Sequence, residues 1–149
     1  MSNYRYSFSL RLRHPSMAPQ GMTDALGLQP SRSWRAGEPR STPQETPLSG
    51  VNLQTYWTTN LGKGSWPPTS LPTAIGAALD GLSNRQAFLH QVRAEGGQAE
   101  FFIGWFFESQ SGDTLPYDLL ARAADLGIDL SFDVYPLQLS LEGEQSAVS

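Results

Sequence analysis

One aromatic stretch, residues 98–108, constrains what this chain can fold into more than any other segment. Of the chain's seven phenylalanine, five tyrosine and four tryptophan residues, five fall within that stretch. Alternation along an extended strand puts apolar side chains on both of its sides: Phe101, Ile103, Trp105 and Phe107 on one, Phe102 and Phe106 on the other. A strand that is apolar on both sides is typical of the middle of a sheet whose two faces are covered. We therefore expect residues 98–108 to form the central strand.

The segments around that strand predict an alternation of strands and helices. Residues 4–13 alternate apolar and polar side chains without a break, as a half-buried strand does. Residues 62–68 contain glycines and two prolines and predict a loop. The predicted elements in chain order are a strand at 4–13, a helix within 16–27 that Ser16 can cap, strands at 31–38 and 51–61, a helix at 71–92 that 81–84 interrupts, the strand at 98–108, a helix at 114–126 capped by Asp113 or Thr114, and a strand at 128–135.

This order of elements predicts an α+β fold. Its first six elements follow the order of the ferredoxin-like split βαβ arrangement, and an extra helix and strand extend it. The helices would lie on one face of an antiparallel or mixed sheet. The arginines of the first strand, together with Asp129 and Asp133 of the last, would lie on the other face. We expect the two aspartates to pair there with Arg5, Arg11 or Arg13.

The chain divides by composition into a folded part and two polar segments. Residues 1–136 are expected to form one domain, and residues 137–149 a loose C-terminal tail. Residues 39–50 are rich in proline, serine, threonine and glycine, and almost nothing in them is apolar. They predict a mobile loop at the tip of the hairpin that the strands at 31–38 and 51–61 would form.

Composition and charge argue against several classes of function. The formal net charge is −4 and the pI is near 5.0, which argues against nucleic acid because such binding needs clustered lysine and arginine. The chain contains no cysteine, so disulfides, thiolate zinc sites and a cysteine nucleophile are excluded. No apolar run approaches the roughly twenty residues of a membrane span. The first residues lack the apolar core of a signal peptide, so we expect a cytoplasmic protein.

No motif for chemistry is complete. His14 and His90 are the only histidines, and neither has a carboxylate or a second histidine at metal-ligand spacing, so we expect both to be structural. Residues 62–65 contain a Gly-Lys-Gly-Ser sequence but lack the spacing of a phosphate-binding loop. There is no nucleophile elbow and no dinucleotide fingerprint. We expect no metal and no cofactor, and we favour a role other than catalysis.

Six residues on two neighbouring predicted strands make the best binding candidate. Tryptophan, tyrosine and arginine dominate binding hot spots, and a mixed cluster of this kind falls just before and just after the predicted loop. The candidate residues are Arg32, Trp34, Arg35, Glu38, Tyr56 and Trp57. The competing interpretation places Trp34 and Trp57 in the core and makes Arg35 and Glu38 a surface ion pair.

Short motifs in a fixed order resemble those of an uncharacterised bacterial family, a domain of unknown function numbered 4279. The resemblance implies one domain over roughly residues 4–136. It implies no reaction, so no catalytic residue follows from it. The motifs that carry it are Leu26-Gly27-Leu28-Gln29-Pro30, Trp34-Arg35-Ala36-Gly37-Glu38, the pair Tyr56-Trp57, and Asp133-Val134-Tyr135.

Two functions of different classes fit this sequence. The first is a small cytosolic protein-binding module, for which an immunity- or antitoxin-like role would suit a small acidic protein. Its partner is another protein or a second copy of the chain, since an uncovered apolar patch at Phe102 and Phe106 would favour a two-fold dimer. The second is a small-molecule or enzymatic site built on the Arg/Trp/Glu cluster. An enclosed polar pocket would favour the ligand, and a flat aromatic face the partner protein.

The composition of residues 39–50 generates the first prediction. These residues cannot bury enough apolar area to offset the entropy lost on ordering. Limited proteolysis with trypsin is expected to cut first after Arg40. A first cut elsewhere, with this segment intact, would show that the segment is docked on the rest of the protein.

Overall fold

Strand β1 (Tyr4–His14) lies in the middle of the main sheet and pairs with a long neighbour on each side. The computed structural model describes residues 3–137. Within them the five-stranded sheet has the order β2-β5-β1-β6-β7. Strand β1 is antiparallel to both neighbours, whereas the edge strand β7 is parallel to the strand beside it. The other four strands are β2 (Arg32–Trp34), β5 (Thr55–Trp66), β6 (Gln98–Phe107) and β7 (Asp129–Pro136).

The prediction that residues 98–108 form the central strand is wrong by one position. Strand β6 has a neighbour on each edge, but the middle of the sheet is β1. Helices also cover only one side of β6. On that side Phe101 and Ile103 are fully buried, whereas Phe102 and Phe106 on the other side are half-buried. Side chains of the sheet itself, rather than a second layer, cover those two rings.

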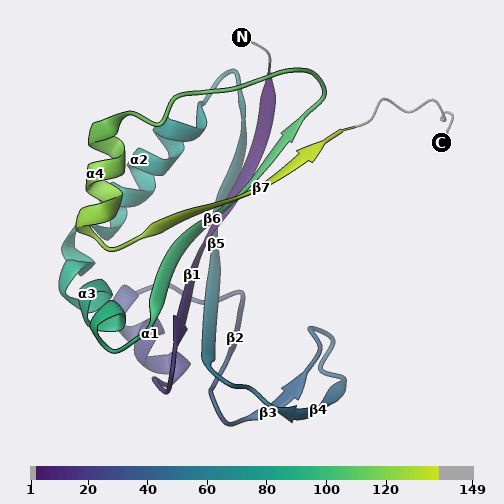
Figure 1. The fold of residues 1–149 in the computed structure, drawn as a ribbon, viewed down its shortest axis with the longest axis vertical. Helices are drawn as coiled ribbons and strands as arrows, with labels where there is room; N and C mark the ends of the chain where they lie inside the picture. The colour runs from purple at the N-terminus through teal and green to yellow at the C-terminus, as the bar shows by residue number, and fades with distance from the viewer. Residues whose placement is uncertain (1–2, 138–149) are drawn as a thin grey trace, which may run out of the picture.

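Four α-helices in the described part of the chain pack against one face of the sheet (Figure 1). The alternating residues of β1, from Tyr4 to Leu12, supply the floor of the core on that face, and all of them are buried. Leu71, Ile75 and Leu79 face them from α2. The helices are α1 (Pro19–Leu26), α2 (Leu71–Leu82), α3 (Gln86–Ala94) and α4 (Tyr117–Asp125), and a 3-10 turn, η1 (Ser83–Arg85), makes the predicted interruption between α2 and α3.

Two helices begin later in the chain than predicted, because the residues expected to cap them are engaged in other hydrogen bonds. Helix α1 begins at Pro19, since the His14 ring accepts the backbone N–H groups of Ser16 and Met17, and Ser16 caps nothing. Helix α4 begins at Tyr117, after Pro116. Asp113 instead accepts a hydrogen bond from the Tyr4 hydroxyl at 2.5 Å, which holds the loop before α4 against the first strand.

The segment 62–65, predicted as a loop, is strand. It continues β5 opposite β1, with the register shifted at Phe8 and Ser9. Two glycines make this possible. Gly62, beside the shift, has a φ of 153°. Gly64 lets the Tyr6 hydroxyl lie 2.5 Å from where a Cβ would be. Pairing with a long strand thus holds residues 62–65 in an extended conformation, although their local composition favours a turn.

A small second sheet occupies the segment predicted as a mobile loop. Strands β3 (Pro39–Ser41) and β4 (Pro47–Val51) pair with each other beyond the end of β2 and β5, away from the helices (Figure 1). All of their residues are exposed. The mobility of residues 39–50 stays a prediction. Residues 138–149 of the predicted tail lie outside the described part of the chain, and no helix within residues 3–137 is both long and apolar enough to cross a membrane.

The difference between the two faces of β6 can be measured. Phe101→Ala is expected to lower the free energy of unfolding by about 3–5 kcal/mol, the range for a large side chain deleted from a packed core. Phe106→Ala should cost only about 1–2 kcal/mol, because that ring is half-buried on the face without helices. Urea denaturation of both variants checks this. Equal losses would mean that both faces of β6 are covered.

Candidate functional site

The face of the main sheet opposite the helices, here called the outer face, carries the row of arginines that the alternation of residues 4–13 predicts. The apolar side chains of β1 point to the helices, so Arg5, Arg11 and Arg13 must point away from them. The register places Thr58 and Glu100 on either side of Arg11, and Tyr56 beside Arg13. Neighbouring strands therefore add polar and aromatic side chains on each side of the arginine row.

Three arginines on this face lie over aromatic rings. The Arg11 guanidinium carbon is 3.6 Å from the centre of the Phe102 ring. Arg13 lies 5.4 Å from the Tyr56 ring and Arg32 lies 4.8 Å from the Trp34 ring. The two rings on β2 and β5 stack on each other, with centroids 4.6 Å apart and an angle of 27°. We call this set the arginine–aromatic platform: Arg11, Arg13, Arg32, Trp34, Tyr56 and Phe102.

Few acidic groups neutralise the platform. Arg13 approaches Glu100 at 3.7 Å, and Glu100 also accepts a hydrogen bond from Ser131 at 3.1 Å. Arg32 donates to the carbonyl oxygen of Ser41 at 3.3 Å. The Nε atom of Arg11 is buried and has no hydrogen-bond partner among the described residues. The side chains of Arg11, Arg13 and Arg32 are only partly buried, and their exposed N–H groups, rather than this buried Nε, are suited to donate to a carboxylate from outside the chain.

The expected pairing of Asp129 and Asp133 with the arginines of β1 is wrong. Strand β6 lies between β1 and β7, so Glu100 rather than an aspartate is the acidic neighbour of the arginine row. Asp129 instead lies 3.4 Å from Arg93 of α3. Asp133 accepts a hydrogen bond from the Tyr135 hydroxyl at 2.9 Å, and this bond raises the pKa of Tyr135.

The structure brings together three of the six predicted site residues. Arg32, Trp34 and Tyr56 lie on the outer face, as part of the platform. Trp57 is the neighbour of Tyr56 in the strand and therefore points to the other face, where it is fully buried and donates to the Thr23 hydroxyl at 3.0 Å.

The remaining two predicted residues make a turn rather than a binding group. The Glu38 carboxylate accepts the backbone N–H of Arg35 at 3.0 Å. Between them Gly37 has a φ of 86°, a conformation that favours glycine. The Trp-x-x-Gly-Glu motif thus forms the turn that follows β2. This turn accounts for the glycine and the glutamate of the motif, and no ligand is needed to explain them.

Sequence reasoning missed Arg11, Arg13 and Phe102 as members of the site. The alternation of β1 already placed both arginines on the polar face. What it lacked was the pairing register, which sets Arg13 beside Tyr56 and Arg11 between Thr58 and Glu100. Register is fixed by contacts between distant segments and has no local signal.

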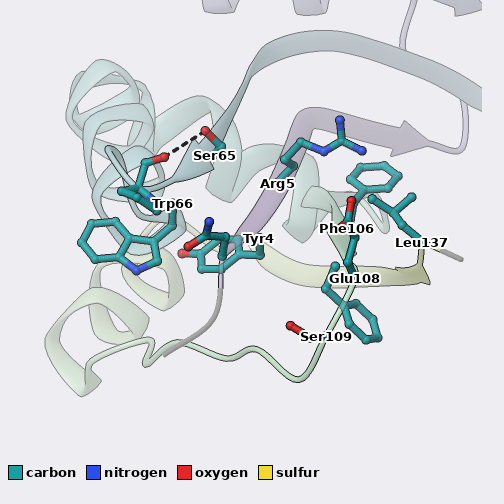
Figure 2. Close-up of a pocket in the computed structure, with 11 residues that line it drawn as sticks. Tyr4, Arg5, Ser65, Trp66, Phe106, Glu108, Ser109 and Leu137 are labelled. Atoms are coloured by element: carbon teal, nitrogen blue, oxygen red, sulfur yellow. Dashed lines mark hydrogen bonds between the residues drawn. The ribbon is translucent and has the colours of Figure 1, made fainter. Parts of the chain in front are cut away.

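Hollows occur elsewhere on the molecule. One of about 570 Å³, shown in Figure 2, is lined by Tyr4, Arg5, Trp66, Phe106 and Glu108 among others. It adjoins a second hollow of about 540 Å³ that shares Arg5, Ser65 and Phe106 with it. Two further hollows lie between α2 and α4, and beside α4 and β7. None of these four is lined by Arg32, Trp34 or Tyr56.

Tyr4, which lines the first hollow, is a structural group. Its ring stacks on Trp105 with centroids 3.8 Å apart. Its hydroxyl donates to Asp113 and accepts the backbone N–H of Leu71, the first residue of α2, at 2.9 Å. Burial raises the pKa of Tyr4, and the hydrogen bond to Asp113 adds to that effect, so the hydroxyl stays protonated.

Both histidines are engaged in contacts between elements. His14 is buried; its Nδ1 accepts two backbone N–H groups, so Nε2 carries the proton and donates to Glu95 at 2.8 Å. His90 of α3 contacts the carbonyl oxygen of Asp125 at 2.6 Å, linking α3 to α4. Within residues 3–137 no three side chains of the metal-binding types come together.

The fold and this face define an α+β domain that covers one side of its sheet with helices and leaves an arginine–aromatic platform open on the other. The chain belongs to the family described as Domain of unknown function (DUF4279), whose profile matches residues 3–137. That match confirms the resemblance carried by the short motifs of the sequence. No curated protein and no solved structure matches the chain.

The contact between His14 and Glu95 predicts a dependence of stability on pH. The hydrogen bond from His14, with a second from Gln91, holds the pKa of Glu95 below its ordinary value. A lowered folded-state pKa stabilises the protein above the unfolded-state pKa, and this contribution is lost as the pH falls through the folded-state pKa. The stability gap between the parent and Glu95→Gln should therefore shrink between about pH 6 and about pH 3. Urea midpoints across that range measure it; a constant gap would contradict the assignment.

Proposed function

We propose that this protein is a cytoplasmic protein-binding module whose platform binds an acidic segment of a partner protein. The observation that carries the proposal is the run of three arginines over aromatic rings on the open face of the sheet. Arginine and aromatic side chains supply most of the energy in protein interfaces, and they do so where the partner excludes water. An open sheet face of this composition is a surface of that kind.

The charge of the platform narrows the chemistry of its partner. Of its three arginines, only Arg13 lies within 4 Å of a carboxylate oxygen among the described residues, although Glu100 is also the neighbour of Arg11 in the register. The Arg11 guanidinium is already held flat against Phe102, so its geometry is fixed before a ligand arrives. A glutamate or aspartate of a partner could accept hydrogen bonds from the exposed part of this guanidinium, though not from its buried Nε. Little side-chain entropy would be lost, which favours binding.

The second function considered from the sequence, a small-molecule site on the Arg/Trp/Glu cluster, finds less support. Glu38 and Arg35 are occupied in a turn, and Trp57 lies in the core. Ligand sites are concave, whereas the four hollows described above lie away from Trp34 and Tyr56. These two observations favour a protein over an enclosed ligand at the platform.

The scaffold of this proposed module is the ferredoxin-like split βαβ arrangement. The order β2-β5-β1-β6, with each strand antiparallel to the next, supports that assignment. So does the placement of α1 between β1 and β2, and of α2 and α3 between β5 and β6. Helix α4 and strand β7 would then be the extension that the order of elements predicts.

Two kinds of protein could supply the acidic segment that binds the platform. One is a foreign protein, as in an immunity- or antitoxin-like pair. The other is a second copy of this chain, because Glu100 and Asp133 give the β6–β7 side of the same face an acidic character. The same acidic side disfavours a nucleic acid, because it would repel the phosphates of a nucleic-acid strand that lay across the sheet.

A photo-crosslinking experiment tests the proposal. Thr58 lies between Arg32 and Arg11 in the register, so a photo-crosslinking amino acid at position 58 should capture the partner in cells that make the protein. The matched control places the same amino acid at Tyr117, which is 86% exposed on the helix side. We expect a protein product that depends on position 58 and disappears when Arg11→Gln and Arg32→Gln are combined.

The captured species decides between the alternatives. A product of twice the chain mass, with sedimentation of the pure protein above 16.3 kDa, identifies a second copy as the partner. A different protein with an acidic contact segment identifies a foreign partner. A product that contains RNA, or capture equal at positions 58 and 117, would overturn the proposal.

A further inference from the structure

A second place on the outer face has the chemistry of a binding site and is distinct from the platform. It lies at the opposite end of β1, at Arg5, whereas the platform includes Arg13 at the other end of the same strand. Eight residues of extended strand, roughly 26 Å, separate these two positions. Here the surface is hollowed rather than flat, with a volume of about 540 Å³. The hollow is lined by Arg5, Tyr6, Ser7, Lys63, Gly64, Ser65 and Phe106.

The lining residues converge because of the strand register. Ser65 lies opposite Arg5, and Lys63 lies opposite Ser7, so the two cations sit on one diagonal of the β1–β5 pair. On the other side of β1, Phe106 lies opposite Arg5. Three strands thus contribute two positive charges and two hydroxyl groups to one concavity.

The charge within this hollow is one-sided. Its lining contains one arginine, the only lysine of the chain and no carboxylate, in a protein of formal net charge −4. Among the described residues, neither cation lies in an ion pair. The nearest acidic group in the register is Asp133, one strand beyond Gly104, and the Tyr135 hydroxyl hydrogen-bonds it. Glu108 lines only the adjoining hollow.

An apolar surface lies beside the two cations. The Phe106 ring stacks on Tyr135 with centroids 5.0 Å apart and an angle of 12°. The Phe106 ring and the Ser7 hydroxyl both lie close to Gly104, each 3.1 Å from the position that a Cβ of that residue would take. Figure 2 shows the continuation of the space, with Arg5 and Phe106 on one side and Ser65 and Trp66 on the other.

We propose that this hollow binds a small organic anion, with a carboxylate or phosphate head at Arg5 and Lys63 and an apolar body against Phe106. Arginine offers a planar fork and lysine a point charge, and together they suit an oxyanion head. The Ser7 hydroxyl can add a hydrogen bond, whereas that of Ser65 already donates to the carbonyl oxygen of Pro67 at 3.1 Å. An apolar wall with a few convergent polar groups is the usual composition of a ligand site.

Titration of the full chain with three probes tests the site: phenyl phosphate, benzoate and inorganic phosphate. Backbone and lysine side-chain NMR shifts would be followed at low ionic strength. We expect saturable shifts that concentrate at Arg5, Ser7, Lys63 and Ser65. Inorganic phosphate should bind several-fold more weakly than phenyl phosphate, because it lacks the apolar body. The comparison of phenyl phosphate with benzoate identifies which head group the site prefers.

Matched variants locate the binding. Arg5→Gln and Lys63→Gln should each weaken phenyl phosphate at least about tenfold, the loss of one charge-assisted hydrogen bond. Arg85→Gln on η1 removes an equal charge from the helix side and should change nothing. Shifts spread over all arginines, an equal loss in the control variant, or parent-like affinity in Arg5→Gln would overturn the proposal.

Discussion

The pairing of β1 with a long strand on each side is the interaction on which the rest of the structure depends. It fixes one row of tyrosine, phenylalanine and leucine under the helices, and the same alternation places Arg5, Arg11 and Arg13 on the opposite face. A shift of one residue in either ladder would bury the arginines and expose the core. Burial of one row therefore positions the other, so the candidate sites on the outer face are consequences of the core.

Each end of β1 is joined to the helices by a buried polar side chain. Tyr4 at one end bridges the loop before α4 and the first turn of α2. His14 at the other end holds the entry to α1 and the end of α3 through Glu95. These buried groups have their hydrogen bonds satisfied, and an unsatisfied one would cost about 1–3 kcal/mol. The helices are thereby held in place over one face, and the other face is left open.

The sequence predicts the helices and strands of this fold better than it predicts which strands pair with each other, and the reason is physical. Alternation and helical spacing are local, and they correctly predict β1, β7, the broken helix α2–α3 and the polar row. Pairing is not local. The segment 62–65 becomes strand only because β1 lies beside it, and Asp129 contacts Arg93 rather than β1 because β6 intervenes. For the same reason Tyr56 and Trp57, adjacent in sequence, could not be assigned to opposite faces until the sheet was known.

Net charge describes this protein poorly at the scale on which it would recognise a ligand. The excess of acidic residues governs long-range attraction and repulsion, which salt screens beyond about 10 Å. At contact distance the β2–β5–β1 side of the outer face presents Arg5, Arg11, Arg13, Arg32 and Lys63, and the β6–β7 side presents Glu100 and Asp133. A long polyanion laid across the sheet would meet both signs. A short acidic segment or a small anion could contact the basic side alone, so under the proposals made above the division of charge would select for the size of the ligand as well as its sign.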